Sequence, residues 1–167
     1  MSDAQAEFSV VYDVTEVELR HDQRLLELFR LWQSKRADRI APARADIPTE
    51  ELLPWLGNII LLDVIDGGKD FRYRLFGSLI AREAGFDMTG KMLSEYPIKS
   101  RLPFLFQVHR ELVRRACPAL AEHNPGVPNV RRRRRLLLPF SSDGKTVDMT
   151  LSANYAIEVV RPPERYL

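Results

Sequence analysis

The stretch IILLDVIDGGKDFRYRLF, residues 59–76, decides how this chain folds. Residues 59–65 form a short apolar run rich in β-branched side chains, which is typical of a buried strand. Residues 66–69, Asp-Gly-Gly-Lys, have the composition of a turn. Residues 70–76 then alternate between polar and apolar side chains, so one face carries Phe71, Tyr73 and Leu75. The whole stretch therefore predicts an antiparallel β-hairpin.

A second strand-rich region lies at the other end of the chain. Residues 130–140 predict one strand, and Ser-Ser-Asp-Gly at 141–144 predicts a hairpin turn after it. Residues 147–159 alternate strictly with a period of two, which predicts a long strand with one buried face. A short strand is also expected at 119–123, which brings the number of predicted strands to five.

Helical patterns fill most of the remaining sequence. Thr15 is expected to cap a helix that ends near Arg39, with Leu25, Leu28, Phe29 and Trp32 on one face. A short helix is expected at 78–84 and a longer one from about 100 to 116, whose apolar face includes His109. The first helix carries more apolar surface than one packing face needs, because Leu26 and Leu31 extend it.

The composition is that of an ordinary soluble domain. The chain has 167 residues, of which 45% are hydrophobic and 29% charged, with a net charge of +2. The longest apolar run is far shorter than the roughly 20 residues that cross a bilayer, and the polar first residues do not resemble a secretory signal. Cys117 is the single cysteine, so an internal disulfide is impossible and a cytoplasmic location is expected.

Several motifs together resemble a PAS domain, and in particular the bacterial family known as the fifth PAS group. They are Trp32, PTEELLPWL at 48–56, NIILLDVI at 58–65, FRYRLFGSLI at 71–80, GFDMTGKML at 85–93 and LLLPFSSDGKTVDMTLSA at 136–153. The resemblance implies an α+β fold with a five-stranded antiparallel sheet in the order 2-1-5-4-3, and helices on one face that enclose a small cavity. Residues 1–44 would then form an N-terminal strand and helix extension, and residues 45–167 the PAS-like domain.

Six residues are candidates for lining that cavity: Tyr73, Arg74, Phe76, Phe86, Phe104 and His109. Most are aromatic and come from elements that should converge, so a small apolar ligand of unknown identity is expected. Arg74 has two interpretations. Either it pairs with an acid such as Asp63 or Glu83, or it clamps an anionic ligand with both arms of its guanidinium.

No cofactor or metal is predicted. Some PAS domains resemble this layout and bind haem through a histidine on the long helix, but a lone histidine on an apolar stripe favours a hydrogen-bonded core residue for His109. Flavin-binding relatives carry an Asn-Cys-Arg-Phe-Leu-Gln run, whereas Cys117 precedes Pro118 and favours an inert, buried thiol. Metal-ligand spacing is absent from the sequence.

The sequence favours signalling over catalysis. It holds no Gly-x-Ser-x-Gly, no His-Glu-x-x-His and no phosphate loop, and its three histidines are scattered, so no enzymatic activity is expected. We expect a stand-alone PAS-type sensory module that binds a small ligand or a protein partner. Without an output domain in the chain, it would act in trans on a signalling protein. A homodimer formed through the N-terminal helix is expected as well.

The arginine run at 131–135 supports the alternative hypothesis. Five consecutive arginines can bind nucleic acid or an anionic surface. In a strand, however, Arg131, Arg133 and Arg135 fall on one face and Arg132 and Arg134 on the other, which favours a solvated strand end. Because no helix-turn-helix, zinc or RNA-binding signature is present, a nucleic-acid partner is not expected.

Overall fold

The computed structural model describes residues 8–160 and contains the predicted hairpin. Strands β2 (Ile59–Ile65) and β3 (Asp70–Phe76) pair antiparallel, with Val64 opposite Phe71. The turn between them places Gly67 at a φ of 68°, a left-handed conformation that glycine adopts without strain. The hairpin prediction is confirmed, but Leu75 packs on the opposite face of the sheet from Phe71 and Tyr73, because a register shift between Leu61 and Leu62 interrupts the alternation of β3.

The sheet has six strands rather than the five expected. The other four are β1 (Phe8–Tyr12), β4 (Ala119–His123), β5 (Val130–Phe140) and β6 (Met149–Val159), and the order across the sheet is β1-β4-β5-β6-β2-β3. Strand β1 pairs antiparallel with β4, with Phe8 opposite His123, so the order differs from the expected one by a strand added at that edge. The addition satisfies backbone groups of β4 that an edge strand would leave unpaired.

The helical elements are short except for two. The α-helices are α1 (Glu16–Leu19), α2 (Gln23–Arg36), α3 (Thr49–Leu52), α4 (Ser78–Ala84) and α5 (Leu102–Arg115), with 3-10 turns at 44–46, 53–58, 66–68, 93–95 and 99–101. The single helix predicted from Thr15 is in fact two helices. Thr15 caps α1, and the side chain of Asp22 accepts a hydrogen bond from the backbone N–H of Leu25 and caps α2.

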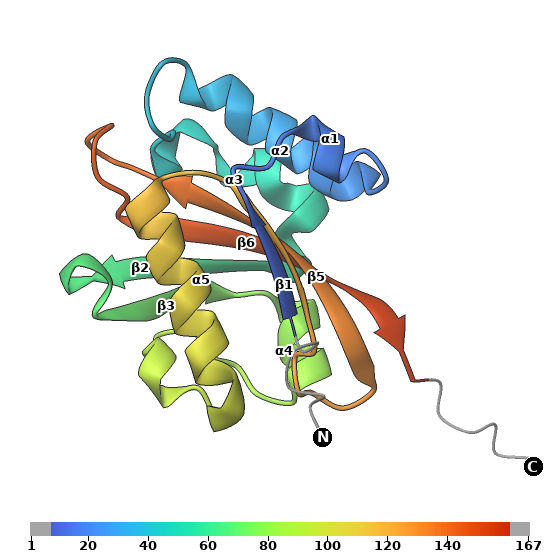
Figure 1. Cartoon of the computed structure of the whole chain (residues 1–167). Coiled ribbons are helices and arrows are strands. Elements are labelled where there is room, and N and C mark those ends of the chain that lie inside the picture. Colours follow the sequence, from blue (N-terminus) through green and yellow to red (C-terminus); the bar gives the residue numbers. More distant parts are fainter. Residues whose placement is uncertain (1–7, 161–167) are drawn as a thin grey trace, which may run out of the picture.

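Helices cover both faces of the sheet, which corrects the prediction of one covered face. Alternate residues of β5 show this directly: Leu136 and Leu138 belong to one core with α2, and Leu137 belongs to another with α5. We call these the α2-side core and the α5-side core. In Figure 1, α5 crosses in front of the sheet while α1 and α2 lie along its upper side. The apolar stripe of α2 is therefore buried against the face of the sheet that carries Leu136 and Leu138.

Strand β6 is buried on both faces over residues 149–154, although one buried face was predicted. Its polar side chains Thr150, Ser152 and Asn154 are at most 1% exposed. They keep hydrogen-bond partners inside the protein: Thr150 bonds His109, and the Asn154 amide donates to the Ser152 hydroxyl. A polar side chain in an alternating strand therefore does not mark a solvent-facing position here.

Two contacts fix the helices on the sheet. The indole N–H of Trp32 in α2 donates to the carbonyl oxygen of Pro139 over 2.8 Å. At the start of α4, Gly77 lies so close to the chain that an added Cβ would be 2.4 Å from the carbonyl oxygen of Gly57. Within residues 8–160, no helix is both long and apolar enough to span a membrane.

Candidate functional site

The α5-side core gathers five of the six candidate residues. Tyr73 and Phe76 come from β3, and their ring centroids are 5.5 Å apart; Phe86 follows at 6.1 Å from Phe76. Phe104 and His109 come from α5 and belong to the same core, Phe86 packing at its edge. These residues therefore form one largely aromatic interior between α5 and the sheet.

His109 is fully enclosed in this interior. Its ring is 1% exposed, Nδ1 lies 3.0 Å from the hydroxyl oxygen of Thr150, and the Phe71 ring packs 5.5 Å away. Burial, with a smaller contribution from the charge of Arg135, lowers the pKa of His109 to about 3. The imidazole is therefore neutral at physiological pH and makes the core hydrogen bond that the sequence favoured.

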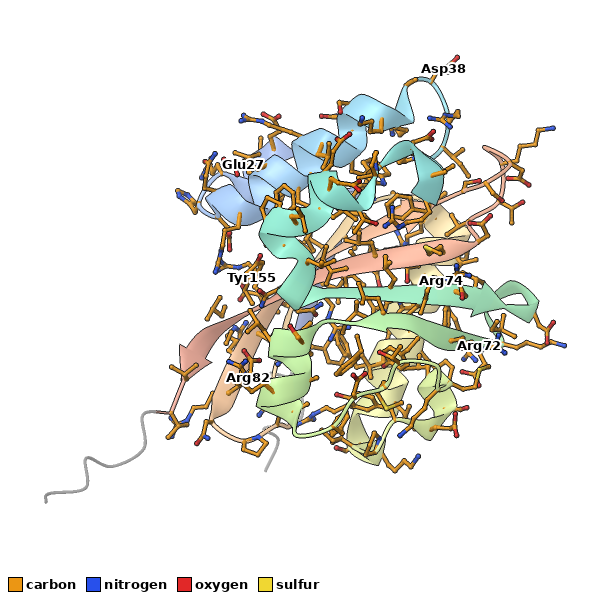
Figure 2. The ribbon with its side chains drawn as sticks, turned by 180° about the vertical axis from the view of Figure 1, so that it is seen from behind. Glu27, Asp38, Arg72, Arg74, Arg82 and Tyr155 are labelled. Carbon is orange, nitrogen blue, oxygen red and sulfur yellow. The ribbon has the colours of Figure 1, made fainter. Side chains whose placement is uncertain are left out.

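Arg74 does not line the interior, which corrects its place among the candidates. Its guanidinium Nε lies 3.0 Å from the nearer carboxylate oxygen of Asp63 on the neighbouring strand, and its side chain is 60% exposed. Figure 2, which views the molecule from the side opposite α5, shows Arg74 and Arg72 on the face of the sheet turned toward the viewer. Of the two interpretations of Arg74, the structure has the pairing with Asp63, because alternation along β3 turns Arg74 away from Tyr73.

The arginine run is not a solvated strand end, except at Arg131. Arg133 and Arg135 are 2% and 5% exposed and point with Leu137 into the α5-side core. Arg132 and Arg134 lie on the other face, where both bond Glu122 and Arg134 also bonds Asp22. The prediction failed because partners distant in sequence, including Glu83 against Arg133, take up the charges. The run therefore offers little exposed basic surface.

The sequence reading missed three residues of the interior: His123, Arg135 and Tyr96. His123 lies on β4 with its ring centroid 4.6 Å from that of Phe104, and Tyr96 packs edge-on against Phe86 at 5.4 Å. The sequence could have predicted the burial of Arg135, because in a strand it lies on the same face as the apolar Leu137 two residues later.

The charges of this interior are unusual for a protein core. Burial lowers the pKa of His123 well below its ordinary value, and Arg135 and Arg133 add to the effect. Burial raises the pKa of both Tyr73 and Tyr96, so their phenols keep their protons. Burial also lowers the pKa of Arg135 to about 10, which still leaves its guanidinium charged at pH 7. Neutral histidines and tyrosines thus surround a buried cation.

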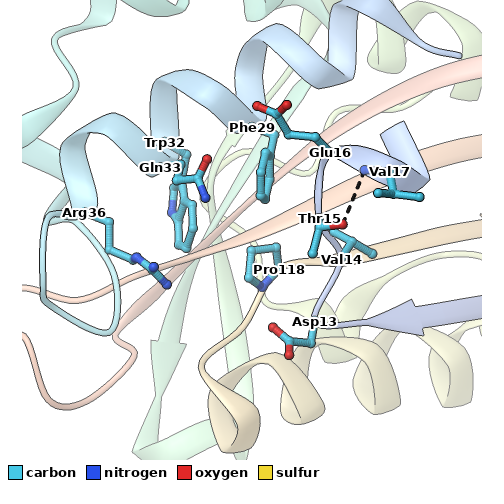
Figure 3. Close-up of a pocket in the computed structure, with 10 residues that line it drawn as sticks. All are labelled: Asp13, Val14, Thr15, Glu16, Val17, Phe29, Trp32, Gln33, Arg36 and Pro118. Carbon is cyan, nitrogen blue, oxygen red and sulfur yellow. Dashed lines mark hydrogen bonds between the residues drawn. The ribbon is translucent and has the colours of Figure 1, made fainter. Parts of the chain in front are cut away.

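Two hollows on the opposite side of the molecule are weaker candidates. One, of about 390 Å³, lies between α2, the loop at 13–17 and Pro118, and is lined by Phe29, Trp32 and Arg36 (Figure 3). The other, of about 510 Å³, adjoins it at Arg36 and includes Cys117. Most of the polar side chains around the first are exposed to water, so nothing there requires a ligand.

Two further kinds of site were considered in the described part of the chain: a reactive cysteine and a metal site. Cys117 is partly rather than fully buried, and burial raises the pKa of its thiol, so the thiolate that reacts with electrophiles is disfavoured. Between residues 8 and 160, no three His, Cys, Asp or Glu side chains gather in a way that could hold a metal ion.

The structure is thus an α+β domain in which one long helix and an antiparallel sheet enclose an apolar interior that contains several aromatic rings and a buried charge. A family model described as a PAS domain matches residues 20–153, and the chain belongs to this family. The match confirms the resemblance drawn from the sequence motifs, and it identifies the chain as a PAS-type module.

The other comparisons add little. A solved structure described as "Structure of an RNA-binding Light-Oxygen-Voltage Receptor" is similar with a TM-score of 0.45 and 17% sequence identity. The similarity covers 70% of this chain and 36% of that chain, so this chain spans little more than a third of the receptor's length. No curated protein matches the chain.

Proposed function

We propose that this chain is a sensory PAS module that binds a small ligand between α5 and the sheet. The observation that carries the proposal is the set of buried polar side chains that converge in an otherwise apolar interior: His109, Thr150, Ser152 and Asn154. Ligand sites in proteins combine apolar walls with a few fixed polar groups in this way. We propose no catalytic activity for the chain, and we propose that it acts in the cytoplasm.

The ligand would be detected on purified protein in two ways. Native mass spectrometry reports a co-purified small molecule, and a thermal-shift panel reports ligands added afterwards; an absorbance spectrum identifies haem or flavin directly. Ala121→Val adds two methyl groups opposite Arg135 and should abolish the shifts, while Arg74→Gln on the outer face should retain them. A chain that is empty and unresponsive to the whole panel contradicts the proposal.

The signal would leave through a protein in trans, and a second copy of the chain is the expected first partner. The expected surplus of apolar surface on α2 is not present, because Leu26 is buried and Leu31 packs against the α2-side core. The exposed apolar side chains that remain available for a dimer contact on this side include Val17 at 63% and Leu53 at 60%. Light scattering should therefore give a dimer that Val17→Glu or Leu53→Glu weakens. A monomeric mass for the unaltered chain at high concentration contradicts the dimer.

We do not propose binding to nucleic acid or to an anionic surface as a second function. It depended on the arginine run, in which only Arg131 remains largely exposed.

A further inference from the structure

The α5-side core holds a cation that no side chain neutralises. Arg135 is 5% exposed, and within residues 8–160 no carboxylate lies within ion-pair distance of it. The neighbouring Arg133 is neutralised by Glu83 of α4, and the two nearby histidines are neutral. The interior therefore carries one uncompensated positive charge, which a folded protein rarely keeps without an anion beside it.

Hydrogen-bonding atoms around this cation also lack partners. The Nε atoms of Arg133 and Arg135 and Oδ1 of Asn154 are buried without a hydrogen bond to any described residue, and the ring nitrogens of His123 have at most a weak contact with the backbone of Asn124. His123 is 3% exposed and Asn154 1% exposed, so bulk water does not satisfy them. Buried polar groups are nearly always paired, and several unpaired ones in one place indicate a missing partner.

The sheet register places these atoms side by side. Arg135 lies opposite Asn154 on β6 and opposite Ala121 on β4, and Arg133 lies opposite His123 on β4 and Ala156 on β6. Because alternate residues share a face, all of these side chains point toward α5. The two alanines place only a methyl group beside each arginine side chain.

A pocket at the β1–β4 end of the sheet borders this region at His123. Its volume is about 130 Å³, and His123, Phe104, Phe8, Ser100 and Arg101 are among the residues that line it. Its volume equals that of roughly four water molecules at about 30 Å³ each, so an occupant must be small. The Phe104 ring on His123 gives this pocket an apolar wall beside the polar ring.

We propose that the interior binds a small monocarboxylate, whose carboxylate pairs with Arg135 and whose other end lies toward Phe104 and the aromatic side chains. One uncompensated guanidinium matches one negative charge, and its planar fork fits a carboxylate with two parallel hydrogen bonds. A doubly charged phosphate would need a second cation beside Arg135, and the neighbouring Arg133 already pairs with Glu83. This inference rests on the proposed function, because it names the ligand class of the same interior.

Thermal shift and calorimetric titration with matched probes test the proposal. Sodium acetate, propionate, butyrate and benzoate are compared with the corresponding neutral amides, and sodium chloride at equal concentration controls for ionic strength. The carboxylates should raise the melting temperature and the amides should not. Arg135→Gln and Arg135→Met should weaken carboxylate binding by about tenfold or more, since they remove a charge-assisted hydrogen bond. Arg131→Gln, an exposed change on the same strand, should leave binding unchanged.

The outcomes separate this inference from the proposed function. If the amides bind as well as the carboxylates, or if both Arg135 variants keep the carboxylate response, the anion site is wrong and the ligand-binding module stands. If no probe binds and no small molecule co-purifies, both proposals fail. Should Arg135→Gln not fold, Arg135→Met and the comparison of carboxylates with amides on the unaltered chain still decide the question.

Discussion

His109 should make the stability of the fold depend on pH. Its pKa is about 3 in the folded chain, because the ring is buried, against 6.5 for an exposed histidine. On acidification the unfolded chain therefore takes up a proton that the folded chain does not. The free energy of unfolding is unaffected above the unfolded pKa and falls as the pH drops from there toward the folded pKa. Between about pH 7 and about pH 5, this one side chain should remove about 2 kcal/mol.

The matched variant is His109→Gln, which removes the titratable ring and keeps an amide near the Thr150 hydroxyl. His123, whose pKa is also depressed by burial, contributes with the same sign, so the variant should lose roughly half of the acid sensitivity in this range. His21→Gln is the control, since His21 is exposed and lies outside both cores. Carboxylates such as Glu111, with a pKa of about 2, act mainly at lower pH.

Urea unfolding at the two pH values, followed by circular dichroism, measures the effect. Only the difference between the two pH values matters, so any cost of His109→Gln at neutral pH cancels. If the variant loses as much free energy on acidification as the unaltered chain, His109 is protonated in the folded state and the argument from its burial is refuted.

Two further changes test the packing. Trp32→Phe removes the donor to the buried carbonyl of Pro139 and should cost about 1–3 kcal/mol in urea unfolding; an unchanged midpoint would contradict this. Gly77→Ala places a Cβ against the backbone of Gly57 and should cost more than Gly85→Ala, which meets no neighbour and costs only about 1–2 kcal/mol for its left-handed backbone. Equal losses in thermal melts would refute the steric argument.

The sequence predicted those elements whose pattern is decided locally. The hairpin at 59–76 combines a buried apolar run, a Gly-Gly turn and an alternating strand, and each part favours the same structure. In contrast, the buried polar side chains of β6 were assigned to solvent. Thr150 is buried because His109, 41 residues earlier in the chain, offers it a hydrogen bond, and no local pattern reports such a partner.

The candidate site shows the same limit. The aromatic residues of the interior were predicted, because apolar side chains at strand and helix spacing identify a core. Arg133 and Arg135 were not, although their phase with Leu137 pointed inward, because five adjacent arginines look like a solvated segment. The burial of Arg133 depends on Glu83, 50 residues away, and only the folded chain brings the two together.

Strand β5 has a consequence for how the molecule transmits change. Arg135 points into one core, and the adjacent Arg134 points to the other side, where it bonds Asp22, the N-cap of α2. The two residues are separated by roughly 3.3 Å of strand. We therefore expect a displacement of β5 at Arg135 to reach the Arg134–Asp22 ion pair at the start of α2. Strand β5 lies in the sheet between the two cores and carries side chains into both. It therefore connects the α2-side core and the α5-side core without a hinge.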